Sequence, residues 1–132
     1  MSAELLTRGW NARRGEAVAE SFTADGRRIE VARPGARLEG REAIAAHTQA
    51  YIGAVPDCVL DVRFARSMNG ITLFEWTFRG THTGDAPGFP ATGRTIHLDG
   101  VSVLEMDGDL IAEERVYWDA ATLFGLLEEV AP

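Results

Sequence analysis

The chain contains no lysine, and all 13 of its basic residues are arginine. This absence excludes a Schiff-base lysine, covalently bound pyridoxal phosphate and the lysine-containing loop that binds nucleotide phosphates. Arginine stays charged and is a poor base. A general base therefore has to be an aspartate, a glutamate or one of three histidines, which are His47, His82 and His97.

Cysteine occurs once, as Cys58. A lone cysteine excludes an internal disulfide framework and a metal site built from several cysteines. The three histidines also lack the spacing of metal ligands. We therefore expect no metal, and nothing in the sequence indicates a nucleotide or flavin cofactor.

Long apolar runs are absent as well. No segment approaches the roughly 20 consecutive apolar residues that cross a bilayer, and the first residues lack the basic and apolar regions of a signal peptide. The net charge of −7 and the pI of about 4.9 argue against nucleic acid or an anionic membrane as a partner. These features predict a cytoplasmic protein.

The chain does have enough apolar residues for one hydrophobic core. It is 132 residues long, with 45% hydrophobic and 25% charged residues, which is the size of one domain. In the first part, apolar residues recur every three or four positions. This spacing predicts helices over residues 3–13, 16–22 and 41–53, a short strand over residues 27–31, and a loop or second short strand over residues 32–38.

Beyond residue 58 the apolar residues alternate, which is typical of strands. The predicted strands are residues 58–64, 71–83, 94–106 and 110–118. Asn69-Gly70 and Asp107-Gly108 are hairpin turns, and Asp119 caps a last helix over residues 120–129. Helices followed by a bent antiparallel sheet and a closing helix predict an α+β domain.

Four short motifs occur in an order and at a spacing that are more specific than any one of them alone. They are residues 80–84 (Gly-Thr-His-Thr-Gly), 90–94 (Pro-Ala-Thr-Gly-Arg), 107–110 (Asp-Gly-Asp-Leu) and 115–119 (Arg-Val-Tyr-Trp-Asp). With the helical first half, they resemble the SnoaL-like polyketide cyclases of the nuclear-transport-factor-2-like superfamily. The resemblance implies a single SnoaL-like domain over residues 1–132. It also implies a cone-shaped, curved antiparallel sheet wrapped around N-terminal helices, with a C-terminal helix, an apolar pocket and a homodimer.

The superfamily includes polyketide cyclases, ketosteroid isomerases and limonene-epoxide hydrolases. In the cyclases and epoxide hydrolases, an acid/base aspartate follows the arginine that matches Arg115, whereas this chain has Val116 there. A pocket histidine of the cyclases falls on Val101. Both usual catalytic positions are therefore valines, so the family's acid/base roles do not transfer and fold alone does not give the reaction.

Other ionisable residues are candidates for that chemistry. A two-residue turn at residues 107–108 would place His97, Asp99 and Glu114 on one sheet face, in an apolar wall. Asp99 and Glu114 would be diagonal neighbours roughly 7 Å apart. Two carboxylates this close in an apolar wall hold one proton more tightly, which raises the pKa of one of them. They are the candidate acid/base pair, with His97 as partner or donor. Alternatively, these are solvated strand residues or partners of Arg94 and Arg115, and a one-residue shift would swap the faces.

Several residues are candidates for substrate binding. Trp76 and Tyr51 combine apolar area with a hydrogen-bond donor, and Val101 and Val116 would add apolar wall. His82 ends a strand beside the loop over residues 84–92, where a turn-stabilising hydrogen bond is the alternative role. In addition, we expect a lid at Phe89 and a core histidine at His47.

Three functions are consistent with these features. The first is a cofactor-independent cyclase or isomerase that acts on a small apolar carbonyl compound by acid/base catalysis in an enclosed pocket. The alternative is a non-catalytic module of the same fold that binds a small hydrophobic ligand. The third is a dimeric scaffold whose pocket is filled by its own side chains.

Overall fold

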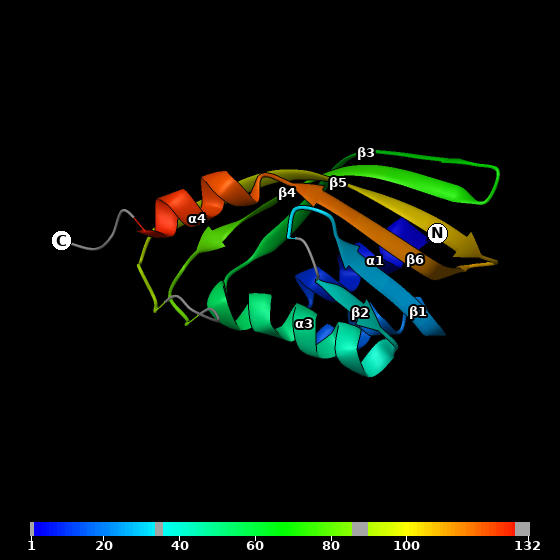
Figure 1. Ribbon diagram of the computed structural model, residues 1–132, viewed down its shortest axis with the longest axis horizontal. Helices are drawn as coiled ribbons and strands as arrows, with labels where there is room; N and C mark the ends of the chain where they lie inside the picture. The colour runs from blue at the N-terminus through cyan, green and yellow to red at the C-terminus, as the bar shows by residue number, and fades with distance from the viewer. Residues whose placement is uncertain (1, 34–35, 86–89, 129–132) are drawn as a thin grey trace.

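The computed structural model describes residues 2–33, 36–85 and 90–128 (Figure 1). In chain order the helices and strands are α1 (Ser2–Asn11), α2 (Gly15–Ala19), β1 (Phe22–Glu30), β2 (Arg37–Glu39), α3 (Arg41–Ala54), β3 (Val59–Met68), β4 (Ile71–Thr81), β5 (Thr95–Asp107), β6 (Leu110–Trp118) and α4 (Ala120–Glu128).

The described strands form one six-stranded sheet in the order β2-β1-β6-β5-β4-β3. Neighbouring strands are antiparallel except β1 and β6, which are parallel. The sheet curves, and α3 lies along one side of it while α4 extends from the end of β6 (Figure 1). The predicted α+β class, with a curved sheet, N-terminal helices and a C-terminal helix, is confirmed.

The hairpin turn at Asn69-Gly70 and the Asp119 cap are confirmed as well, whereas the second hairpin turn is residues 108–109, one position later than predicted, because Asp107 still pairs with Leu110. Asn69 and Gly70 have φ angles of 53° and 76° and join β3 to β4, because a two-residue hairpin loop favours positive φ at both positions. The Asp119 carboxylate accepts a 2.9 Å hydrogen bond from the backbone N–H of Thr122, which satisfies a free donor in the first turn of α4.

The second helix is shorter than predicted, and β1 begins earlier. The expected helix over residues 16–22 ends at Ala19, and Phe22 is already the first residue of β1. Phe22 is fully buried and pairs with Ile111 of β6. The register of this pairing shifts between Phe22 and Arg27, so residues 24–26 form an irregularity within the strand.

A bulge in the β5–β6 hairpin determines which side chains face the core. Asp107 pairs with Leu110 and Met106 with Ile111, but Glu105 then pairs with Glu113. Ala112 is therefore an extra residue on β6. Because side chains alternate along a strand, one extra residue reverses the faces of everything beyond it.

The hydrophobic core lies between the sheet and the helices. Its buried members come from every layer and include Leu6, Val18, Phe22, Ile44, Ile52, Leu60, Phe74, Phe78, Ile96, Leu104, Ile111 and Leu123. The alternating Phe74, Trp76 and Phe78 of β4 all point to this side. Within the described part of the chain, no helix is long and apolar enough to cross a membrane.

Candidate active site

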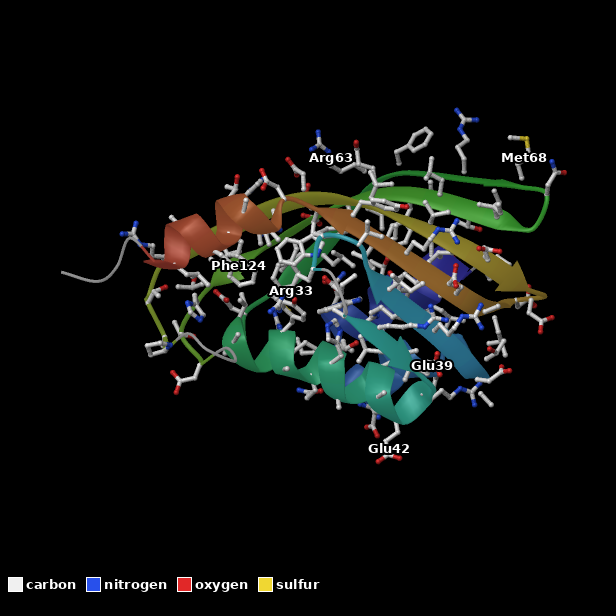
Figure 2. The ribbon with its side chains drawn as sticks, in the orientation of Figure 1. Arg33, Glu39, Glu42, Arg63, Met68 and Phe124 are labelled. Carbon is white, nitrogen blue, oxygen red and sulfur yellow. The ribbon has the colours of Figure 1, made fainter. Side chains whose placement is uncertain are left out.

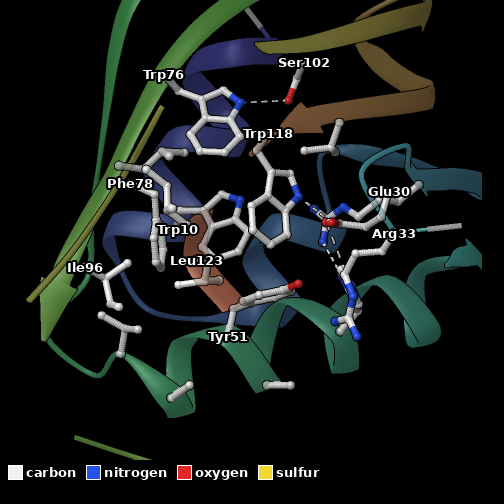
Figure 3. A pocket seen from close by; sticks show the side chains of 18 of the residues that line it. Trp10, Glu30, Arg33, Tyr51, Trp76, Phe78, Ile96, Ser102, Trp118 and Leu123 are labelled. Carbon is white, nitrogen blue, oxygen red and sulfur yellow. Dashed lines mark hydrogen bonds and ion pairs between the residues drawn. The ribbon is translucent and has the colours of Figure 1, made fainter. Parts of the chain in front are cut away.

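A cavity of about 170 Å³ opens within the core, between the sheet and helices α1, α3 and α4 (Figure 3). It is slightly larger than an apolar protein cavity of about 150 Å³ that accepts benzene. Most of its wall is apolar or aromatic, from Leu6, Trp10, Leu60, Phe74, Trp76, Phe78, Ile96, Leu98, Val116, Trp118, Leu123 and Phe124. The interior therefore suits a small compound with an apolar body.

Glu30, the last residue of β1, brings a carboxyl group into this apolar wall. The side chain is 6% exposed and accepts a 2.6 Å hydrogen bond from Trp118 Nε1, and Figure 3 shows the two residues meeting at one side of the cavity. Burial raises the pKa of Glu30, although the Trp118 hydrogen bond and the charge of Arg28 oppose the rise. A buried carboxyl group with a raised pKa is suited to proton transfer.

Arg28, two residues earlier, lies on the same side of β1. Its Nε donates a 2.8 Å hydrogen bond to Oε1 of Glu114, and both side chains are almost fully buried. Its Nη1 donates to Thr48 of α3 at 2.7 Å. Its buried Nη2 has no hydrogen-bond partner among the described residues. The charge is therefore paired, but one donor remains for a ligand.

His47 of α3 lies between Arg28 and Glu30. Arg28 Nη1 is 3.3 Å from His47 Nδ1, and since a guanidinium only donates, Nδ1 is the acceptor and Nε2 carries the proton. That Nε2 is 4.0 Å from Oε1 of Glu30. Burial, followed by the charges of Arg28 and Arg33, lowers the pKa of His47 from 6.5 to about 4. The ring is thus neutral near pH 7.

Tyr51 follows His47 by one helical turn and faces the same cavity (Figure 3). Its ring packs edge-on against His47 and Trp118, with centroid distances of 5.2 and 6.4 Å. The buried hydroxyl makes no hydrogen bond of normal geometry to a described residue. Burial and the nearby Glu30 carboxylate raise the pKa of Tyr51, while Arg33 opposes this. The hydroxyl is therefore a neutral donor available to a ligand.

Arg33 and Phe124 lie beside this group at the surface. The Arg33 guanidinium stacks 5.0 Å above the ring of Phe124, which connects the segment after β1 to α4 (Figure 2). Both residues also line the cavity. Because Arg33 is exposed whereas Arg28 is buried, this contact lies at the solvent side of the polar group.

The prediction that His97, Asp99 and Glu114 share a face is wrong. Glu114 is buried beside the cavity, but His97 and Asp99 have side chains 63% and 58% exposed and lie 3.6 Å apart on the outer face of the sheet. Asp99 accepts a hydrogen bond from Thr77 there. The bulge at Ala112 is the cause, because it reverses the relation between the two strands.

Other predicted site residues fall on both faces. Trp76, Tyr51, His82 and Val116 line the cavity, although the indole donor of Trp76 is already bonded to Ser102 at 3.0 Å. Val101 was expected in the wall but pairs with Tyr117 on the outer face, again because of the bulge. Phe89 lies outside the described residues.

The buried positions of Arg28 and Glu30 could not be predicted from the residues around them in the chain. Residues 27–31 read Arg-Arg-Ile-Glu-Val, and two charged residues two apart are typical of a solvated strand face. Here that face is covered by α3 through Thr48 and His47. Only a tertiary contact identifies them, whereas the position of His47 on an apolar helix stripe was a visible, though weak, signal.

Comparison with known proteins agrees with this fold. A sequence model of the SnoaL-like polyketide cyclases matches residues 1–125. The chain belongs to the SnoaL-like polyketide cyclase family. No curated protein matches it in sequence. That the SnoaL-like domain extends over all of residues 1–132 stays a prediction.

Solved structures share the SnoaL-like fold at low identity. A protein from Jannaschia sp. CCS1, assigned as a SnoaL-like polyketide cyclase, has a TM-score of 0.84 at 18% identity, over 99% of this chain and 92% of its own. AclR from Streptomyces galilaeus, assigned as a hydroxylase, has a TM-score of 0.81 at 16% identity, over 97% and 83%. A protein from Acidithiobacillus ferrooxidans, assigned as a polyketide cyclase, has a TM-score of 0.77 at 22% identity, over 98% and 96%.

Ionisable groups reach the cavity wall of this SnoaL-like chain from several elements, including β1, α3 and β6. The position expected to hold an aspartate is Val116, which lies in the cavity wall, whereas Glu30 and His47 come from β1 and α3. No three histidine, cysteine, aspartate or glutamate side chains within residues 2–33, 36–85 and 90–128 are grouped as metal ligands. Membership of the family supports a cyclase- or isomerase-type function.

Proposed function

We propose that this protein is a cofactor-independent cyclase or isomerase that acts on a small, mostly apolar carbonyl compound, with Glu30 as its acid/base residue. One observation carries the proposal: the Glu30 carboxyl group is buried in an apolar cavity wall, and its only hydrogen bond to a described side chain comes from Trp118. A carboxylate in such a place is a stronger base than one in water.

The first step is removal of a proton from the carbon next to the carbonyl group. The Glu30 carboxylate takes this proton, and the electron pair of the broken C–H bond moves into the substrate to form an enolate. The Tyr51 hydroxyl and Arg28 Nη2, both buried and unpaired among the described residues, are suitable donors to the enolate oxygen. Donors placed before the charge develops stabilise it without reorganisation.

The second step returns the proton, so no co-reactant is needed. In an isomerisation, protonated Glu30 gives its proton to a different carbon of the same substrate. In a cyclisation, the enolate carbon forms a bond to a second carbonyl carbon of the molecule, and the new alkoxide oxygen takes the proton. A compact apolar cavity favours both outcomes because it excludes water from the enolate.

The experiment uses 2-tetralone, a bicyclic ketone with exchangeable protons beside its carbonyl. Exchange of these protons for deuterium in D₂O is followed by NMR. Wild type is expected to accelerate exchange, and Glu30→Gln to reduce the enzymatic rate by at least about 100-fold. Glu105→Gln is the matched control, because Glu105 is on the outer face. Folding of each variant is checked by its amide NMR spectrum.

The results distinguish the enzyme from a binding module. Binding of 2-tetralone without accelerated exchange would contradict the proposal and favour a module that holds a hydrophobic ligand, which the largely apolar wall also fits. Acceleration that persists in Glu30→Gln would exclude Glu30 as the base. Failure to bind any small ketone would contradict the assigned substrate class and favour a scaffold.

We also propose that the chain forms a homodimer through the outer face of the sheet. Four large apolar side chains on that face are each about two-fifths exposed: Phe64, Ile71, Leu73 and Tyr117. Patches of this kind mark interaction surfaces. Light scattering is expected to give twice the chain mass, and Tyr117→Asp to give a monomer. A monomeric wild type would exclude the dimer.

A cytoplasmic location stays a prediction.

A further inference from the structure

A second polar position in the cavity has no part in the proton transfer. His82, just beyond the end of β4, is 2% exposed and lines the cavity. Its Nδ1 is 2.8 Å from Thr92 Oγ1, while its Nε2 has no partner among the described residues. A buried nitrogen without a hydrogen-bond partner costs free energy. A bound ligand would supply that partner.

The backbone around His82 holds the ring in place. Its N–H donates to the carbonyl of Arg94, and its own carbonyl accepts from the N–H groups of Thr92 and Gly93. These contacts tie the end of β4 to the segment before β5. The side chain is therefore positioned before any ligand binds, which lowers the entropic cost of binding.

The hydrogen bonds of Thr92 allow the tautomer of His82 that is protonated at Nε2. Thr92 Oγ1 already accepts a 3.2 Å hydrogen bond from the Arg94 N–H. Its own proton is available for His82 Nδ1, and in the tautomer with Nδ1 as the acceptor of this bond the ring proton is on Nε2. In this arrangement the unpaired atom is a donor, so its ligand partner is an oxygen acceptor.

His82 lies at the far end of the cavity from Glu30. Arg28 contacts α3 at Thr48, whereas Gly84, two residues after His82, donates to the carbonyl of Ala54. These two contacts are six residues apart, or about 9 Å along a helix. Figure 3 shows Glu30 on one side of the cavity and Ile96 on the other, and Ile96 pairs with Gly80 near the end of β4.

We infer that His82 Nε2–H binds a second oxygen of the ligand, at the opposite end of its apolar ring system from the carbonyl group that reacts at Glu30. The wall between the two ends is aromatic and aliphatic. The ligand class is therefore a compound of one or two fused rings with an oxygen acceptor at each end. This inference rests on the proposed function for the location of the carbonyl group, but it concerns binding and not proton transfer.

Two ligands of matched size test the inference. In 6-methoxy-2-tetralone the second oxygen lies across the fused rings from the ketone, and in 6-ethyl-2-tetralone a methylene replaces it. Calorimetry gives the dissociation constant of each ligand for wild type, His82→Leu and His97→Leu. In wild type, the methoxy compound is expected to bind about threefold to tenfold more tightly than the ethyl compound, as one added hydrogen bond predicts.

The preference is expected to disappear in His82→Leu and to remain in His97→Leu, because His97 lies on the outer face. Equal affinities in wild type, or a preference that survives in His82→Leu, would overturn the inference. His82→Gln, which keeps an N–H donor, is expected to restore part of the preference. If the leucine variant does not fold, ¹⁵N NMR of wild type decides: only the methoxy compound should shift the His82 Nε2 signal.

The same samples separate this inference from the proposed function. A preference that depends on His82, without deuterium exchange at the ketone, would retain the inference and reject the catalytic role of Glu30. Exchange without the preference would retain the proposed function and reject the role of His82.

Discussion

The indole Nε1 of Trp118 donates to Oε2 of Glu30 at 2.6 Å, so the end of β6 holds the carboxyl group at the end of β1. This contact stabilises the ionised form and opposes the effect of burial on the pKa of Glu30. The proposed base is therefore tuned by two opposing effects, desolvation and one charge-assisted hydrogen bond.

The first prediction concerns this hydrogen bond. Trp118→Phe removes the donor but keeps a ring beside Tyr51, so the pKa of Glu30 should rise further. The rate of 2-tetralone exchange increases with pH as Glu30 ionises, and in the variant this increase should occur at higher pH. Trp76→Phe is the control, since the Trp76 indole bonds to Ser102 instead. An unchanged pH profile in Trp118→Phe would argue against Glu30 as the titrating base.

The second prediction concerns the buried pair of Arg28 and Glu114. Glu114→Ala leaves the guanidinium buried without its partner and should reduce the free energy of unfolding by about 3–5 kcal/mol. Replacement of both residues, Arg28→Met with Glu114→Leu, should recover most of this loss. Urea denaturation measures both. Glu39→Ala breaks an exposed pair with Arg37 and should cost under about 1 kcal/mol; similar losses at positions 39 and 114 would contradict the prediction.

The third prediction concerns pH and His47. Its pKa is about 4 in the folded protein and about 6.5 when unfolded. Its contribution to stability is therefore full above pH 6.5 and is lost as pH falls through 4, by about 3 kcal/mol in total. The raised pKa of Glu30 acts in the opposite sense, because that contribution is full at low pH and is lost as pH rises.

The comparison of wild type with His47→Gln isolates the histidine. Glutamine keeps an acceptor for Arg28 but does not titrate, so Glu30 and the arginines Arg28 and Arg33 remain in both proteins. The difference in unfolding free energy between the two should shrink as pH falls from 6.5 to 4. A difference that is independent of pH would show that His47 is not held neutral.

The fourth prediction concerns Gly100 of β5, over which the Trp76 indole lies. A Cβ at position 100 would be 2.2 Å from Trp76 Cζ2, so Gly100→Ala should displace the indole into the cavity. The expected loss is about 1–3 kcal/mol of stability, with weaker binding of 2-tetralone. Gly53→Ala in α3 is the control, because nothing lies within 4 Å of its added Cβ. It should be neutral or stabilise by up to about 1 kcal/mol.

The order of the elements could be predicted from local patterns. Apolar residues three or four apart gave the helices, alternation gave the long strands, and Asn69-Gly70 gave a hairpin, because each signal depends on neighbours in the chain. Strand ends were less accurate: β3 continues to Met68, four residues beyond the predicted end, because pairing with β4 extends it.

The site was predicted only in part. Trp76, Tyr51 and His82 were identified as candidates for the wall and do line the cavity, because large aromatic or partly polar side chains in core positions are visible in sequence. Glu30 and Arg28 were missed, since nothing near them in the chain indicates that α3 covers their side of β1.

The amino-acid order by itself determined which side chains alternate within each strand and which chemistries are impossible without lysine. Tertiary structure alone decided which of those alternating sets points inward. Ala112 adds one residue to β6, and this turns His97 and Asp99 to solvent while Glu114 stays inside. Because side chains alternate with a period of two, the two faces of a strand are interchangeable until a partner strand sets the register. Only the packing of β1 against α3 and β6 brings Glu30, His47 and Trp118 together.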